Sequence, residues 1–298
     1  MNMRKKIFEI IVIGTSLLLV GCGSRGEVKR DASGKQVLSG YITLSGAFAL
    51  YPLAIQWADE FHRLHPDVDI DISAGGAGKG ITDVLADQVD IAMVSRELKP
   101  QEKEKGALAY AVAKDAVVAT INANNPVYHE LLKTGLSQKQ AMAIWEGKTK
   151  MNVYTRSDAC GAAETWAAFL GKKQEDLKGT GVFGDPGVAE TLQKDVNGIG
   201  FNNIGYAYND KTHKPTKGIA IVPIDVNGNG KLDAEEKFYD TLDELMDAIA
   251  KGKYPAPPAR NLYLVTAGKP KNPVVVEFLK YVRTKGQRLN APAGFIHI

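Results

Sequence analysis

One short stretch, YTRSDACGAAETW at residues 154–166, collects several side chains that could do chemistry. The guanidinium of Arg156 could hold two oxygens of an oxyanion at once, and Asp158 could keep that guanidinium in place. Alternatively, the two residues form a surface ion pair. Cys160 follows at a predicted helix start near Arg156, a setting that lowers the pKa of a thiol.

Cys160 could line a ligand site, act as a reactive thiol or bind a metal ion. A nucleophile needs a base within reach, and the histidines are scattered over His62, His65, His129, His213 and His297. A metal site on one soft ligand is poor, because no second cysteine lies in the body of the chain. These considerations favour the first alternative and leave the other two open.

Three segments place small residues directly before a predicted helix: 45–49, 74–80 and 158–162. A helix start presents unpaired N–H groups and the positive end of the helix dipole, and small residues let an anion approach them. One such segment alone would be explained by a tight turn. Three in one chain indicate an anion site.

A second candidate site is the segment DVNGNGKLDAEE at 225–236, which matches the EF-hand calcium loop at every position. In that pattern side chains, or the backbone carbonyl in the case of lysine, supply oxygen ligands, and Gly230 makes the sharp turn. The alternative is a surface turn rich in Asn, Asp and Gly. The predicted calcium ligands are Asp225, Asn227, Asn229, Lys231, Asp233 and Glu236.

The elements that would position these groups alternate between strand and helix patterns. The segment 50–64 has helical spacing of apolar residues, HPDVDIDIS alternates as a strand does, and VDIAMVS is typical of a buried strand. This order predicts an α/β fold with a parallel sheet. The chain has 298 residues, 44% of them hydrophobic and 24% charged, with a net charge of +3. Such a balance argues against nucleic-acid binding.

The N-terminus has the pattern of an export signal. Three basic residues precede an apolar run at 10–20 that is too short to cross a bilayer. The run ends in LVGC, which resembles a bacterial lipobox. We expect residues 1–22 to be a lipoprotein signal ending at a lipidated Cys22, with plain signal cleavage as the alternative. Residues 23–36 would be a polar tether, and the exported protein would face the periplasm or the cell exterior.

Five segments in this order carry a resemblance to a known family: SGAFALYPLAIQWADEF, ISAGGAGKGITDVLADQVDIAMVSREL, YTRSDACGAAETWAAFL, NNIGYAY and YPAPPARNLYLV. The chain resembles the phosphate-binding proteins of bacterial ABC transporters, as a divergent member. The resemblance implies a two-lobed periplasmic-binding-protein fold of type II with two hinge crossings, near 117–120 and 258–262. Lobe I would comprise 37–118 plus 260–298, and lobe II would comprise 119–259.

The resemblance also implies ligand contacts between the lobes, including an Arg–x–Asp pair that Arg156 and Asp158 match. The sequence departs from the family where hydroxyls and an acceptor aspartate are usual, at Phe48, Ala77, Ser95, Cys160 and Ala162. Each missing donor weakens binding of a buried oxyanion by about 1–3 kcal/mol. The expected ligand-binding residues are Ala47, Phe48, Ala49, Ala77, Gly78, Ser95, Arg96, Arg156, Asp158, Cys160, Gly161 and Ala162.

The resulting hypothesis is a lipid-anchored, monomeric binding protein, not an enzyme, that delivers an inorganic oxyanion to an ABC permease of the inner membrane. Phosphate is the first candidate ligand, and apart from calcium no cofactor is expected. The alternatives are a different anion, a surface or sensing role without transport, and a thiol-dependent enzyme that uses Cys160.

Overall fold

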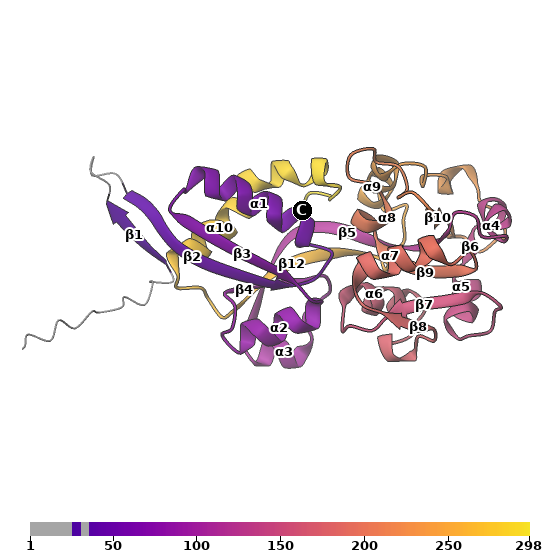
Figure 1. The fold of residues 1–298 in the computed structure, drawn as a ribbon, viewed down its shortest axis with the longest axis horizontal. Helices are drawn as coiled ribbons and strands as arrows, with labels where there is room; N and C mark the ends of the chain where they lie inside the picture. The colour runs from indigo at the N-terminus through magenta and orange to yellow at the C-terminus, as the bar shows by residue number, and fades with distance from the viewer. Residues whose placement is uncertain (1–25, 31–35) are drawn as a thin grey trace, which may run out of the picture.

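The computed structural model describes residues 26–30 and 36–298, and their hydrophobic side chains form two large cores. One core contains buried residues from 38–113 and 262–295, and the other contains buried residues from 116–259. Figure 1 shows these two parts side by side along the long axis. We call them lobe I and lobe II. The exact lobe boundaries predicted from the sequence stay an interpretation, which the two cores support.

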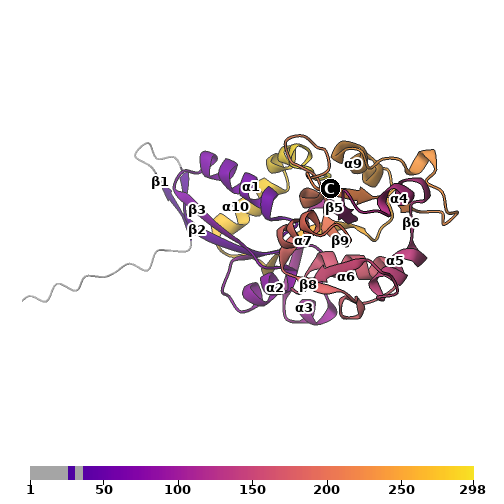
Figure 2. The same ribbon diagram turned by 45° about the vertical axis from the view of Figure 1, so that its right-hand side comes forward.

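Lobe I is a sheet covered by helices on both faces. Strands β2, β3 and β4 are parallel, and β12 runs antiparallel to β4. Helices α1 and α10 lie on one face and α2 and α3 on the other, as both views show (Figures 1 and 2). The strands are β1 (Gly26–Arg30), β2 (Gln36–Gly46), β3 (Val68–Ala74), β4 (Ile91–Val94) and β12 (Ala259–Ala267); the helices are α1 (Tyr51–Leu64), α2 (Ala77–Leu85), α3 (Pro100–Glu104), α10 (Pro273–Val282), η3 (Lys285–Leu289) and η4 (Ala291–Ala293).

The helix α1 illustrates how the sequence specifies these elements. Leu53, Trp57 and Phe61 recur at helical spacing and are all fully buried. A proline stands in the first turn, where its missing N–H costs no hydrogen bond. The apolar face therefore packs onto the sheet, and the opposite face remains polar.

The strand β5 (Ala107–Asn122) links the two lobes. Its first part, 107–116, pairs with β12, and its second part pairs with β9 and β10 in lobe II. The change of partner occurs between Ala116 and Val117. This position adjoins the predicted crossing near 117–120, and β12 begins within the predicted crossing near 258–262.

Lobe II extends the sheet with β9, β7 and β8, which lie parallel to one another. Two tryptophans, Trp145 of α5 and Trp166 of α6, meet edge to face with ring centroids 5.1 Å apart in its core. The strands are β6 (Leu136–Ser137), β7 (Asn152–Arg156), β8 (Thr180–Val182), β9 (Gly198–Asn203), β10 (Ile219–Val222) and β11 (Ile224–Asp225); the helices are α4 (Tyr128–Thr134), α5 (Gln138–Trp145), α6 (Gly161–Phe169), η1 (Gln174–Asp176), α7 (Gly184–Lys194), α8 (Ile204–Ala207), η2 (Ala234–Glu236) and α9 (Leu242–Ala250).

The predicted tether needs a correction. Residues 26–30 form β1, which pairs antiparallel with β2 from Gly26↔Gly40 to Arg30↔Gln36. A Cβ at Gly26 would collide with the side chains of Asn272 and Val274, so this strand also meets the start of α10. This short strand forms without a hydrophobic period of its own, because pairing with β2 supplies its backbone hydrogen bonds. The signal segment 1–22 and Cys22 lie outside the described residues.

Among the described residues, no helix is both long enough and apolar enough to cross a membrane. The α/β two-lobed prediction is matched by a sheet with helices on its faces. The expected parallel sheet is wrong in part, because β5 and β12 run antiparallel to their neighbours.

Candidate ligand-binding site between the lobes

The three small-residue segments predicted from the sequence come together where the lobes meet. The N–H of Gly78, at the start of α2, donates to the carbonyl of Ala159 in lobe II at 3.1 Å. A Cβ at Gly161 would lie 2.3 Å from the carbonyl oxygen of Ser95, so the start of α6 touches the backbone after β4. The Tyr206 hydroxyl donates to the carbonyl of Phe48 at 3.1 Å. Lobe I and lobe II are therefore in contact at all three segments.

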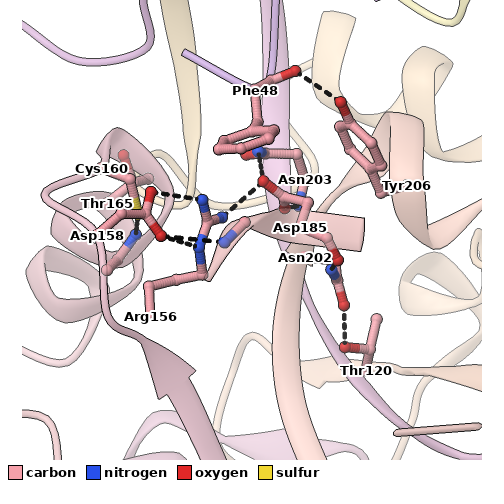
Figure 3. A network of polar contacts seen from close by, with 12 residues as sticks. Phe48, Thr120, Arg156, Asp158, Cys160, Thr165, Asp185, Asn202, Asn203 and Tyr206 are labelled. Carbon is pink, nitrogen blue, oxygen red and sulfur yellow. Dashed lines mark hydrogen bonds and ion pairs between the residues drawn. The ribbon is translucent and has the colours of Figure 1, made fainter. Parts of the chain in front are cut away.

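Arg156 is the charged centre of this contact, at the end of β7. Its side chain is 1% exposed, and Asp158 braces it through two bonds, from Nε to Oδ1 at 2.8 Å and from Nη2 to Oδ2 at 2.7 Å. The predicted Arg–Asp pair is thus a buried bidentate pair rather than a surface one (Figure 3). Burial by itself lowers the pKa of Arg156, but the neighbouring carboxylates of Asp185 and Asp158 raise it overall, so the guanidinium stays charged.

A third charged residue, Asp185, is not among the site residues predicted from the sequence. Its Oδ2 accepts from Nη1 of Arg156 at 2.6 Å, and the residue is fully buried. Figure 3 shows it on the opposite side of the guanidinium from Asp158. The only local signal was its position in the GDPG turn that opens α7, where an acidic residue suits the helix dipole. Its partnership with Arg156 depends on two elements that are distant in sequence.

The ring of Phe48 covers this ion-pair cluster from lobe I. The centre of the ring lies 5.4 Å from Cζ of Arg156, within range of a cation–π contact. Its edge meets Phe183 with centroids 5.6 Å apart, and Phe183 is 60% exposed. The phenylalanine that departs from the expected hydroxyl thus fills space directly above the guanidinium.

Arg96, the other predicted cationic contact, is engaged by carboxylates from both lobes. Its guanidinium pairs with Glu102 of lobe I at 2.7 Å and with Glu164 of α6 at 2.9 Å. Lys99 also pairs with Glu164, at 3.0 Å. These charges join the lobes across their contact, and the pKa of Glu102, although burial tends to raise it, is lowered overall by Arg96. Ser95, which precedes Arg96, meets the start of α6 through its backbone carbonyl.

Cys160 is the N-cap of α6, and its Sγ accepts from the N–H of Ala163 at 3.4 Å. Burial raises the pKa of its thiol to about 12, against the lowering effect of Arg156. The expected fall in pKa is therefore wrong: removal of the thiolate from water outweighs the nearby cation, which two carboxylates already neutralise.

The remaining predicted contacts are small residues packed at the helix starts. Gly161 and Ala162 are the first two residues of α6, so their N–H groups have no acceptor within the helix. The N–H of Ala47 donates to the carbonyl of Met93 at 2.8 Å, which removes it from the set of free donors. Ala47, Ala49, Ala77 and Ala162 are all buried.

A cavity of about 790 Å³ opens beside this cluster. Its lining includes Lys99 from lobe I and Arg156, Ala159 and Glu164 from lobe II. The site can therefore be approached by a small solute from the side of α6 and η1. Its lining carries charged side chains of both signs, which suits a charged solute.

The chain matches the family model described as the PBP superfamily domain over residues 31–285. It belongs to the PBP superfamily. Two curated relatives cover most of this PBP-superfamily chain. The phosphate-binding protein PstS of Bacillus subtilis is 25% identical over 230 residues, covering 71% of this chain and 74% of the relative. The protein of that name from Staphylococcus epidermidis is 24% identical over 300 residues, covering 96% and 86%.

Solved structures show the same fold. A putative phosphate ABC transporter substrate-binding protein with bound phosphate, from Clostridium perfringens, aligns with a TM-score of 0.70 at 21% identity and covers 87% of this chain and 100% of that one. An ABC-type phosphate transport receptor from Vibrio cholerae aligns with a TM-score of 0.63 at 20% identity, covering 86% and 100%. The recognised resemblance and the two-lobed fold class are thereby confirmed.

The PBP-superfamily chain carries its predicted calcium loop on lobe II. Asp225 and Glu236 are buried, and the Asp225 carboxylate accepts from the N–H groups of Gly228 at 2.8 Å and Gly230 at 2.9 Å. Glu236 Oε1 accepts from the N–H of Val226 at 2.8 Å. The loop is thus closed around its own acidic residues by backbone donors.

Two asparagines of this loop point their side-chain NH2 groups toward Asp233. Nδ2 of Asn227 and Nδ2 of Asn229 donate to Asp233 Oδ2 at 2.9 and 2.7 Å. Among the described residues, no three His, Cys, Asp or Glu side chains are close enough together to hold a metal ion. Calcium also uses amide and carbonyl oxygens, so the fit requires the two amides to turn their oxygens inward. Calcium binding stays a prediction.

Proposed function

We propose that this protein is an exported solute-binding protein, not an enzyme, that captures an inorganic oxyanion for an ABC importer, with phosphate as the first candidate. The observation that carries the proposal is the placement of Arg156 at the meeting point of three helix-start segments from two lobes. Relatives named as phosphate-binding proteins, which match most of the chain, support phosphate as the anion. Guanidinium and helix-start N–H groups are the donors that oxyanions prefer.

Isothermal titration calorimetry with phosphate, sulfate and molybdate tests the proposal. We expect phosphate to bind, and weakly for this fold, because Phe48, Cys160 and Ala162 offer no side-chain hydroxyl. Arg156→Ala should abolish the binding, whereas Arg63→Ala, which removes an exposed arginine of α1, should leave it unchanged. Absence of binding for all three anions at millimolar concentration would overturn the proposal.

The proposal includes capture by lobe closure around the anion, with 37–118 plus 260–298 and 119–259 as the two moving bodies. It also includes anchoring of a monomer through a lipid on Cys22 and delivery to a permease. Mass analysis of the mature protein tests the anchor: a diacylglyceryl-cysteine at position 22 is expected, and an unmodified N-terminus would refute it. Cross-linking in membranes separates delivery from a sensing role, since delivery requires the permease as the captured partner.

A thiol-dependent enzyme is the competing class, and burial of Cys160 argues against it. A thiol with a pKa near 12 is protonated at neutral pH and reacts slowly. In a Cys22→Ser chain we expect iodoacetamide to label Cys160 slowly at pH 7.5 in the folded protein and fully in urea. Rapid labelling of the folded chain, with protection by phosphate, would favour the enzyme.

We further propose that the loop 225–236 binds calcium as a structural clip on lobe II. The motif match and the burial of Asp225 and Glu236 support this reading. Millimolar calcium should raise the melting temperature, and Asp225→Asn should abolish that rise. Asp247→Asn, an exposed change on α9, is the control. If calcium does not change the melting temperature, the loop is an Asn- and Gly-rich turn and not a calcium site.

A further inference from the structure

The cluster around Arg156 contains more negative than positive charge before any ligand arrives. Arg156 is the one cation, and both Asp158 and Asp185 pair with it. Three bonds engage Nε, Nη2 and Nη1, out of the five N–H donors of a guanidinium. With both carboxylates ionised, the three side chains carry a net charge of one negative unit. An oxyanion thus meets a site whose positive charge is already compensated.

The two carboxylates differ in what else they do. Asp158 binds the guanidinium through both oxygens and accepts from the N–H of Gly184 at 3.2 Å, so it sets the orientation of Arg156. Asp185 uses one oxygen, Oδ2, and takes Nη1, at the end of the fork away from Nε. That end is the one an arriving oxyanion would need, because Asp158 already occupies the Nε side.

Asp185 is also held in place without Arg156. Its Oδ1 accepts from the backbone N–H of Asn203 at 2.8 Å, and its Oδ2 accepts from Nδ2 of the same residue at 2.8 Å. Asn203 in turn accepts through Oδ1 from Arg260, which pairs with Asp115 at 2.9 Å on the strands that cross between the lobes. This chain of contacts fixes the carboxylate, so Asp185 cannot withdraw when an anion approaches.

Little water reaches this position to screen the charges. Asp185 is fully buried, and the Phe48 ring covers Arg156 from the other lobe. Charges interact more strongly where water is excluded, and a like charge held near a bound anion opposes it. The opposition grows with the charge of the anion, because the Coulomb energy is proportional to it.

Resting on the proposed function, we propose that Asp185 is the residue that determines the affinity and charge selectivity of this site. It acts as an internal counter-ion of Arg156 that stays in place at Nη1 and opposes an oxyanion arriving there. The site therefore binds oxyanions weakly and discriminates against dianions relative to monoanions. Replacing the carboxylate by an amide removes the opposing charge and weakens the hydrogen bond to Nη1, since an amide oxygen is a neutral acceptor.

The test compares sulfate and perchlorate, two tetrahedral anions of charge two and one, together with phosphate, by titration calorimetry at one pH. In Asp185→Asn we expect the Kd for sulfate and for phosphate to fall by at least about tenfold, and the Kd for perchlorate to fall less. Comparing the same anion between two chains cancels its own hydration. Asp195→Asn is the matched control, because Asp195 accepts hydrogen bonds from Tyr154 and Asn152 outside the site.

Stability separates this role from a structural one. Asp185→Asn should lower the melting temperature while it tightens anion binding, whereas loss of a residue that only held the fold would weaken both. If the asparagine variant does not fold, Asp185→Ser, which is smaller and uncharged, takes its place. Equal or weaker sulfate and phosphate binding in a folded variant, with phosphate bound by the unchanged protein, would overturn the inference alone. If no anion binds to any of the chains, the proposed function fails and the inference falls with it.

Discussion

At the scale of single residues, the site is built from charges that compensate one another. Arg156 is buried between Asp158 and Asp185, and Arg96 is held between Glu102 and Glu164. A buried ion pair gains little over an apolar replacement, but removal of one partner leaves an uncompensated charge in the interior. The cost of breaking the Arg156 cluster should therefore be large, although its net contribution to folding is small.

Arg156→Ala should lower the free energy of unfolding by about 3–5 kcal/mol, because two buried carboxylates lose their counter-ion. Urea unfolding followed by circular dichroism measures this change. The control is Arg63→Ala, whose side chain is 71% exposed and pairs only at the surface, and which should cost less than about 1 kcal/mol. A loss below about 1 kcal/mol for Arg156→Ala would show that the carboxylates are satisfied without it.

At the scale of elements, small residues allow the start of α6 in lobe II to approach lobe I. Gly161 lies against the backbone of Ser95, and Gly78 bonds to Ala159. Glycine at 161 is required by the contact alone, since a Cβ there would meet the Ser95 carbonyl oxygen at 2.3 Å. The small residues predicted to admit an anion thus also admit the opposite lobe.

Gly161→Ala should hold the lobes apart, because the rigid backbone at Ser95 cannot move away without opening the contact. Small-angle X-ray scattering should show a larger radius of gyration with unchanged circular dichroism. Gly205→Ala is the control, since a Cβ at Gly205 in α8 meets nothing within 4 Å. Equal radii for the two variants would mean that the lobe contact adapts by other shifts.

At the scale of the whole molecule, two cores are joined by the strands β5 and β12 and by charges across the lobe contact (Figure 1). Glu164 is the residue that joins them electrostatically, because it pairs with both Arg96 and Lys99 of lobe I. The Lys99–Glu164 pair is partly exposed, and pairs of this kind contribute about 0.2–1 kcal/mol and are screened by salt.

Glu164→Gln should therefore favour separation of the lobes, and the radius of gyration should rise at low salt. High salt should expand the unchanged protein and leave the variant nearly unaffected. Glu146→Gln serves as the comparison, since Glu146 also pairs with two lysines, Lys148 and Lys172, but within lobe II. If salt expands the variant as much as the unchanged protein, Glu164 does not join the lobes.

The local patterns of the sequence determined most of the elements and the family. The apolar spacing of α1, the alternation of β3 and the helix start at Cys160 are local features, and each depends on neighbours a few residues away. The order of five motifs then sufficed for the α/β two-lobed fold, which the family match and the solved structures confirm. The pairing of Arg156 with Asp158 was predicted chiefly from the Arg–x–Asp pattern of the resembled family, and the structure shows the pair.

Only the tertiary structure decided what surrounds Arg156. Asp185 reaches it from another helix, and Phe48 reaches it from the other lobe, so no local spacing could reveal either contact. Burial also raises the pKa of Cys160, where the sequence predicted a lowered pKa. Residues 26–30 form β1 because they pair with β2. The physical reason is common to all of these: burial, charge compensation and sheet pairing join residues that are far apart in the chain, and local spacing does not determine them.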